Sequence, residues 1–421
     1  MFMKVFRLFF SLAVAVTLSM AATSCGDDND SDAGKSGGSG GSESSLSESQ
    51  KKEYIDQTGR ELVGKISAED FRPITDLGQY VHDYLTDSKN ETKAVSDFFE
   101  AATNLCTLQD TKTYVKHLFA MSYFSAQFEY KNGAWEKVGT EQGQLRFSFY
   151  DRNGQPCVAE MTAVGSEKEV HASIFDVKDW RYDYYMGYYK KTTENRILLP
   201  SAITVKITQG NAILADIYVS FEVPAGEFEY TSNNAAVALN ATIMGYSITL
   251  EGNYNGSKDA AIRLSVGKRN ETWVKANASS NLRLDSNGEF ISAGNTNLTI
   301  DVLGKVQIKG TVDDVNKVRD MVEGVDRKTT ESEVKNRVEQ INQQMHVNVY
   351  FDGNDTRQAF IQSYPFYEKR SYYNTWKIEP VICFGDGTSY STFEEFGNDS
   401  RFKELIKKVE QLVTDFEHLV K

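Results

Sequence analysis

The sequence predicts an α+β protein with a large antiparallel β-meander and amphipathic helices packed on one face of it. Three changes in residue pattern predict this fold. Apolar residues recur at three and four positions from 48 to 128, alternate with polar residues from 129 to 311, and return to helical spacing from 312 to 421. About 370 residues follow the first fifty, which is enough for one large or two ordinary domains.

Residues 1–24 have the pattern of a secretory signal peptide. Lys4 and Arg7 precede an apolar run from Leu8 to Ala22, and small residues end the run. A run of about fifteen residues is shorter than the roughly 20 that a membrane-spanning helix needs. No other segment of the sequence is long and apolar enough to cross a bilayer.

Cys25 follows this run, and two explanations for it are open. In the first, cleavage occurs after Ala21 and the cysteine is incidental. In the second, the segment Ala22–Thr23–Ser24–Cys25 resembles the signal of a bacterial lipoprotein precursor, with Ala22 in the place of the usual leucine. This resemblance covers about the first 30 residues, and it implies that Cys25 is the lipidation site, carrying acyl chains such as palmitate.

A cluster of acids follows the cysteine, at Asp27, Asp28, Asp30 and Asp32. It resembles the signal that sends lipoproteins of some Gram-negative bacteria to the outer face of the outer membrane. The alternative is a solvated acidic stretch that acts only as a spacer. In both cases residues 25–47 form an acidic, Gly/Ser-rich tether, whose last 20 or so residues have a root-mean-square reach of roughly 25 Å. The expected location is the outer membrane, lipid-anchored and exposed at the cell surface.

Charge and cysteine content limit the partners. The chain has a formal net charge of −13, and removal of Lys4 and Arg7 with the signal leaves about −15. This balance argues against nucleic acid, which needs a positive surface; the membrane is expected to be a partner only through the anchor. After Cys25 only Cys106, Cys157 and Cys383 remain, without metal-ligand or redox spacing. They form either one disulfide with one free thiol or three buried free cysteines, and no cofactor or metal is predicted.

Residues 48–128 are predicted to be helical. The clearest amphipathic helix is TKAVSDFFEAATNL, and others are expected in YIDQTGRELVGKI, ITDLGQYVHDYL and TYVKHLFAMSYFSAQF.

Residues 129–311 are predicted to form the meander. Asn-Gly steps at 132–133 and 153–154 predict hairpins. Alternation from Ile203 to Ile207 predicts one strand, and alternation from Ile213 to Val223, with Ile213 on the apolar face, predicts the next. The apolar face of such a sheet must be covered by helices, a second sheet or a ligand.

Residues 312–421 are predicted to belong to the same domain as the sheet. Gly324 divides a charged helical stretch in two, and residues 346–351 and 375–384 have strand patterns. Residues 385–399 are expected to form a turn, and 400–420 an amphipathic helix that docks onto the body.

The sequence contains no motif of a known catalytic or nucleotide-binding type, such as HExxH, a P-loop or GxGxxG after a strand. The protein is therefore predicted not to be an enzyme. A site assembled from distant residues, such as a Ser/His/Asp triad or a carboxylate pair, would not be visible in the sequence.

Two aromatic clusters are candidate ligand-binding surfaces, because Tyr and Trp offer rigid faces to sugars and proteins. The alternative is that they are strand or loop residues covering the sheet. The second and weaker cluster lies between Tyr364 and Trp376. The first lies within 179–191 and comprises Trp180, Tyr182, Tyr184, Tyr185, Tyr188 and Tyr189.

Two functions are consistent with these observations. The protein is expected to be a lipid-anchored binding module for an extracellular or envelope ligand, such as a glycan, a lipid or another envelope protein. Alternatively, it carries an apolar molecule such as lipid in a cavity under a curved sheet, which looks like the LolA-type lipoprotein carriers by fold-level analogy alone. An apolar pocket larger than ~300 Å³ under the meander would favour the carrier.

Overall fold

The structure is a computed structural model. It describes residues 45–85, 126–141, 143–165, 168–171, 196–222, 224–227, 234–256, 259–284, 290–369, 374–385, 387 and 389–419.

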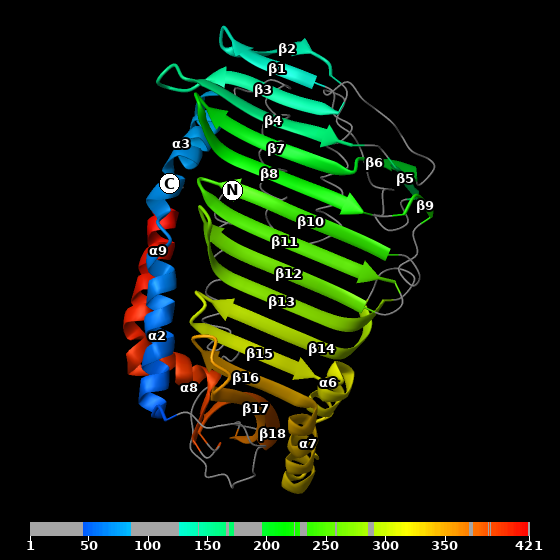
Figure 1. Cartoon of the computed structure of the whole chain (residues 1–421), viewed down its shortest axis with the longest axis vertical. Helices are drawn as coiled ribbons and strands as arrows, with labels where there is room; N and C mark the ends of the chain where they lie inside the picture. The colour runs from blue at the N-terminus through cyan, green and yellow to red at the C-terminus, as the bar shows by residue number, and fades with distance from the viewer. Residues whose placement is uncertain are drawn as a thin grey trace.

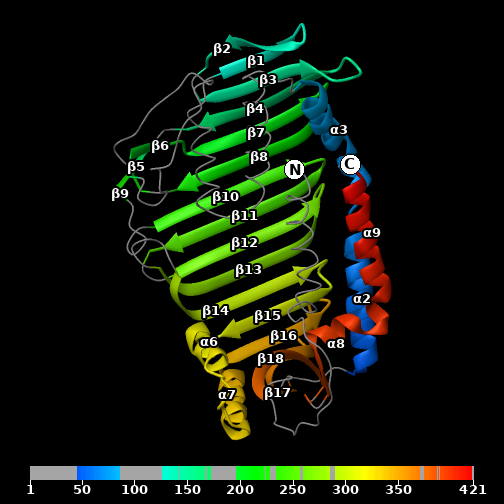
Figure 2. The same cartoon turned by 180° about the vertical axis from the view of Figure 1, so that it is seen from behind.

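The predicted fold class is confirmed: the protein is α+β, with one broad and mostly antiparallel sheet (Figures 1 and 2). Among the described residues, 16 strands form this sheet in the order β19-β18-β17-β16-β15-β14-β13-β12-β11-β10-β8-β7-β4-β3-β1-β2. Almost every strand lies beside its neighbour in sequence, as in a meander, and β1 and β3 are parallel. A second sheet of 3 strands has the order β6-β5-β9.

The bounds of the strands are β1 Ala126–Lys131, β2 Ala134–Gly139, β3 Gln144–Tyr150, β4 Pro156–Val164, β5 Lys168–His171, β6 Arg196–Leu199, β7 Ala202–Gln209, β8 Ala212–Glu222, β9 Gly226–Glu227, β10 Asn234–Ile243, β11 Tyr246–Asn255, β12 Asp259–Lys268, β13 Glu271–Leu284, β14 Phe290–Val302, β15 Val306–Val312, β16 Met345–Phe351, β17 Arg357–Lys369, β18 Asn374–Phe384 and β19 Ser389–Thr392. The α-helices are α2 Glu48–Gly64, α3 Arg72–Tyr80, α6 Val315–Glu323, α7 Glu331–Gln344, α8 Phe393–Asn398 and α9 Lys403–Leu419, with a π-helix at Val81–Leu85.

Turn chemistry sets the register of the first hairpin. Asn132 and Gly133 both have positive φ, 51° and 80°, as a type I′ turn between β1 and β2 requires. The predicted hairpin at this Asn-Gly step is confirmed. In the next one, the Asp151 carboxylate accepts hydrogen bonds from the backbone N–H groups of Asn153 and Gln155, both at 2.8 Å.

The apolar side chains of the central strands decrease in size from one end of the strands to the other. One row toward the α2 end of the strands is buried throughout and is paired across eight strands: Ile217, Ala241, Ile248, Val266, Val274, Val302, Val306 and Phe351. Four residues along β11 from Ile248, away from α2 and on the same face, Gly252 is paired with Ile262, and Ile262 is 47% exposed. The row after that consists of Ala235, Tyr254, Ala260, Ser280 and Thr296, all half-buried. The buried core of these strands therefore lies toward the α2 end.

The segment from α2 to Leu85, which we call the strap, runs across one end of the strands (Figures 1 and 2). Its polar side chains meet successive hairpin ends, so that the whole width of the sheet is tied by one segment. From β19 toward β2 the contacts are Glu48 with Ser389, Tyr54 with Asp352, Glu61 with Lys305, Lys65 with Glu271, Asp70 with Lys268, Tyr84 with Arg152, and Leu85 with Trp135.

Buried contacts anchor the strap near both of its ends. Lys52 is buried, with Nζ 2.7 Å from Glu48 Oε1 and 3.4 Å from Asp399 Oδ2. At the other end, the Trp135 indole Nε1 donates to the Leu85 carbonyl at 2.9 Å. The pairing of Lys52 with Glu48 and Asp399 is what makes its burial possible, since an unpaired buried charge costs several kcal/mol.

Helix α9 packs along α2, as the predicted docking of the C-terminal helix requires (Figure 1). The two helices approach closely at Gly59, where an added Cβ would lie 2.7 Å from Leu405 Cδ2. The Phe71 and Phe416 rings are 5.4 Å apart, so the end of α9 also contacts the strap.

Helices α6 and α7 flank the last strands of the sheet. Gly324 ends α6 as its C-cap, which confirms the predicted division, and a Thr330–Glu333 capping box begins α7. Val334, Val338 and Ile341 of α7 form a small core with Ile378 of β18.

Three local predictions are wrong. In β8 Leu214 is buried and Ile213 is 52% exposed, because a register shift after Ile207 moves the alternation by one residue. Residues 126–128, expected to be helical, are the start of β1, which pairs with both β2 and β3. Part of the expected turn at 385–399 is β19 and α8, because β19 pairs with β18 and Thr392 caps the helix.

Candidate binding site

The predicted lipidation site and the first predicted ligand-binding cluster lie outside the described residues. This holds for Cys25 and for the whole first aromatic cluster, Trp180, Tyr182, Tyr184, Tyr185, Tyr188 and Tyr189. Both remain predictions.

The described residues of the second aromatic cluster lie on strands β17 and β18. Tyr364 of β17 stacks on Tyr390 of β19 with ring centroids 4.3 Å apart, and Tyr367 lies against Trp376 at 4.9 Å. Their ring partners thus lie on strands of the same sheet, as the alternative interpretation of this cluster requires. Tyr367 keeps 42% of its surface exposed.

Side chains suited to metal or thiol chemistry are not grouped in the described part of the chain. No cluster of three or more His, Cys, Asp or Glu residues there could hold a metal ion. Cys157 and Cys383 are free and buried. Burial raises the pKa of Cys157 to about 11 and that of Cys383 to about 12, so both thiols stay protonated and weakly nucleophilic at neutral pH.

A Tyr–Lys–Asp group lies where the strap meets β11 and β12. The Tyr246 hydroxyl donates to Asp70 Oδ2 at 2.6 Å and accepts the Ser67 N–H at 3.0 Å. Lys268 forms an ion pair with the same carboxylate and lies 4.4 Å from the centre of the Tyr246 ring. Burial and the hydrogen bond to Asp70 raise the pKa of Tyr246, so the group holds a protonated phenol and acts as a structural lock.

This lock predicts an acid-dependent loss of stability. Burial raises the pKa of Asp70, but the hydrogen bonds from Lys268 and Tyr246 and the Lys268 charge more than offset this, and the pKa lies below its usual value. The carboxylate therefore stabilises the fold above the pKa of an unfolded Asp, near 3.9, and this contribution is lost as pH falls through the lower folded value. Asp70→Asn should cost about 1–2 kcal/mol at pH 7, in the lower part of the range for charged hydrogen bonds because the side chain is 36% exposed.

Urea unfolding at a series of pH values checks this. The difference between wild type and Asp70→Asn should shrink as pH falls below about 4. Lys268→Met serves as the second arm of a double-mutant cycle. The double variant should lose less free energy of unfolding than the sum of the losses in the two single variants. A difference between wild type and Asp70→Asn that is constant down to pH 2 would contradict the assignment.

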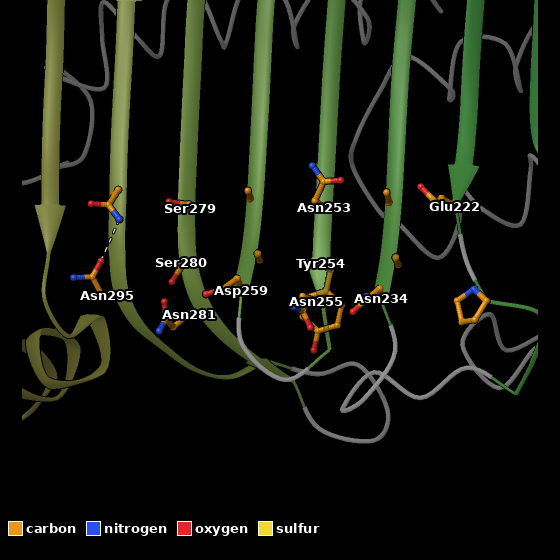
Figure 3. A pocket seen from close by; sticks show the side chains of 16 residues that line it. Glu222, Asn234, Asn253, Tyr254, Asn255, Asp259, Ser279, Ser280, Asn281 and Asn295 are labelled. Carbon is orange, nitrogen blue, oxygen red and sulfur yellow. Dashed lines mark hydrogen bonds between the residues drawn. The ribbon is translucent and has the colours of Figure 1, made fainter.

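A hollow of about 910 Å³ lies at the far ends of strands β8 and β10–β14, away from the strap (Figure 3). Its lining includes six asparagines, and we call it the asparagine hollow. It is lined by Glu222, Pro224, Asn234, Ala235, Ala236, Asn253, Tyr254, Asn255, Asp259, Ala260, Ala261, Ser279, Ser280, Asn281, Asn295 and Asn297.

Regular strand pairing places these residues in rows. Glu222, Ala236, Asn253, Ala261, Ser279 and Asn297 are paired in succession across six strands. Ala235, Tyr254, Ala260 and Ser280 form the next row, whose side chains have the opposite parity. Small residues in both rows leave little side-chain volume at these strand ends, and Asn253 and Asn297 supply amide groups in the first row.

The amide side chains of the hollow are largely uncommitted. Within the described part of the chain, Asn297 Nδ2 donates to Asn295 Oδ1 at 3.1 Å, whereas the exposed side chains of Asn253 and Asn255 have no hydrogen-bond partner. Each free amide offers two donor hydrogens and an acceptor oxygen. The hollow is thus a preformed polar surface that can exchange water for a ligand.

The sequence contained a signal for this site that pattern analysis passed over. The strand ends NNAA, GNYN, ANASSN and GNTN combine asparagine with Ala, Ser and Gly, which are weak strand formers. These segments do not predict a site one by one, because their meeting in one hollow depends on register across the sheet.

Comparisons with protein-family models, with curated proteins and with solved structures found no match for this chain. In the described residues, no helix combines the length and apolarity that a bilayer crossing requires.

Proposed function

We propose that the protein is a lipid-anchored cell-surface lipoprotein that acts as a non-enzymatic binding module, with the asparagine hollow as its binding site. One observation supports this most strongly: a preformed hollow with unpaired amide groups at its rim. A polar group that is not needed for folding and is held on a rigid sheet suits recognition.

The position of the hollow supports the same proposal. The proposed anchor and tether precede α2, which begins the strap at one end of the strands. The hollow lies at the other end of the strands (Figures 1 and 3). A chain tethered in this way can present its binding surface away from the strap.

The alternative function as a carrier receives less support. The apolar rows near the strap are filled by one continuous core of buried residues. The asparagine hollow has polar side chains on most of its strands, which do not suit an acyl chain because their desolvation would be uncompensated.

Filling the hollow tests the proposal. The double variant Ala236→Trp/Ala261→Trp introduces one indole on each side of Asn253, on the same face of the sheet, and strands accept aromatic residues readily. The purified lipoprotein in detergent would be incubated with an extract of its own envelope and medium and measured by native mass spectrometry. We expect wild type to retain a ligand mass, and the filled variant to lose it by at least about tenfold in occupancy.

Asn240→Trp is the matched control. Asn240 is exposed on β10, four residues from Ala236 and on the same face, which places it about 13 Å from that position. This control should bind as wild type does, and circular dichroism should show that all variants are folded. Equal ligand occupancy in the filled variant, or no ligand on wild type, would rule out the hollow as the binding site.

A further inference from the structure

We infer that the ligand of the asparagine hollow is a neutral, hydroxyl-rich oligosaccharide; this inference rests on the proposed function. Its basis is the chemistry of the lining, which has six amides, two serines and two carboxylates and no cation among the described residues. Three classes of ligand can be compared with this set.

Anionic ligands fit the lining poorly. Glu222 lies on β8 and Asp259 on β12, and among the described residues of the lining neither Lys, Arg nor His joins them. A phosphate, sulfate or uronate would lose hydration without gaining an opposite charge, and would be repelled by the two carboxylates. The same two carboxylates are good acceptors for hydroxyl groups.

Peptides also fit poorly, for a reason that lies in the sheet. An extended peptide binds a sheet by pairing with the free backbone of an edge strand. Strands β10–β13 are each paired on both sides, so their backbone groups are already used. Among the described residues of the lining, the Tyr254 ring is the largest apolar group, which leaves little for a peptide side chain to anchor against.

A neutral sugar matches what remains. Vicinal hydroxyls both donate and accept, as the amides of Asn253 and Asn255 do. Asn255 is paired across strands with Asn234 on one side and with Asp259 on the other, so that three polar side chains stand in a line about 4.8 Å apart (Figure 3). Asn253 lies two residues before Asn255 on the same strand, so its amide extends this polar set on the same face of the sheet.

A printed glycan array tests the ligand class, with the detergent-solubilised full lipoprotein as the probe. We expect binding to neutral glycans above sialylated or sulfated ones. For the best neutral glycan, titration calorimetry should show that Asn253→Ala/Asn255→Ala raises Kd about tenfold, as the loss of two or more net hydrogen bonds implies. Asn240→Ala, an exposed asparagine on β10 outside the hollow, should leave Kd unchanged.

The outcomes separate this inference from the proposed function. Three results would overturn the neutral-sugar assignment: binding only to acidic glycans, no binding on the array, or a Kd for Asn253→Ala/Asn255→Ala that equals the wild-type Kd. If the envelope ligand that is lost from the filled variant proves to be a peptide, the binding site stands and the ligand class is wrong. If filling the hollow changes nothing, the site itself is wrong.

Discussion

Cys25→Ala is expected to release almost all of the protein from the envelope fraction. Without the thiol no acyl chain can be attached, and the remaining tether and the negatively charged chain offer little affinity for an anionic bilayer. Two or more chains are needed for stable anchoring, so their loss converts a membrane-bound protein to a free one. Fractionation followed by immunoblotting measures this directly.

The same experiment has a matched control and a mass test. Cys106→Ala removes a thiol elsewhere in the chain and should leave the protein with the membranes. The intact mass of the wild-type protein should correspond to a chain that begins at Cys25 and carries acyl groups. A mature chain that begins at Ala22, or a Cys25→Ala variant that still sediments with membranes, would refute the lipid anchor.

Leu62→Ala is expected to lower the free energy of unfolding by about 2–5 kcal/mol, the range for truncating a buried leucine. Leu62 is 1% exposed on α2 and belongs to the core that joins the strap to the sheet. Because the strap ties successive hairpin ends, loosening it at one point weakens the support of several strands at once. Urea unfolding gives the loss in stability, and hydrogen exchange over residues 48–85 shows whether the strap opens first.

Gln57→Ala is the control for this change. Gln57 is exposed on the same helix and makes only a surface hydrogen bond to Glu53, at 3.2 Å. Its replacement should change stability by less than about 0.5 kcal/mol. A Leu62→Ala variant that loses no more than this control would show that the strap does not contribute to the stability of the sheet.

Much of the fold could be predicted from local pattern. Alternation identified the central strands because one of their faces is buried, and helical spacing identified α2, α7 and α9. The errors have local physical causes. Ile213 was placed on the wrong face because a bulge shifts register without leaving a mark in the alternation. β19 was read as a turn because its four residues are stabilised by pairing with β18 and not by their own propensity.

The candidate site could not be predicted in the same way. Asn253 and Asn297 are 44 positions apart in sequence, and each alone looks like a residue of a polar strand. They line one hollow because β11, β12, β13 and β14 pair in a register that carries one row of side chains across the sheet.

The sequence by itself determined the central strands, the main helices, their order as a meander, and the pattern at Cys25 that predicts an anchor, because these depend on neighbours in the chain. Tertiary structure alone decided that one N-terminal segment ties the ends of the strands from β19 to β2, and that small and amide residues gather at their far ends. Both depend on cross-strand register, which brings residues far apart in sequence side by side. Register is set by the packing of the whole sheet.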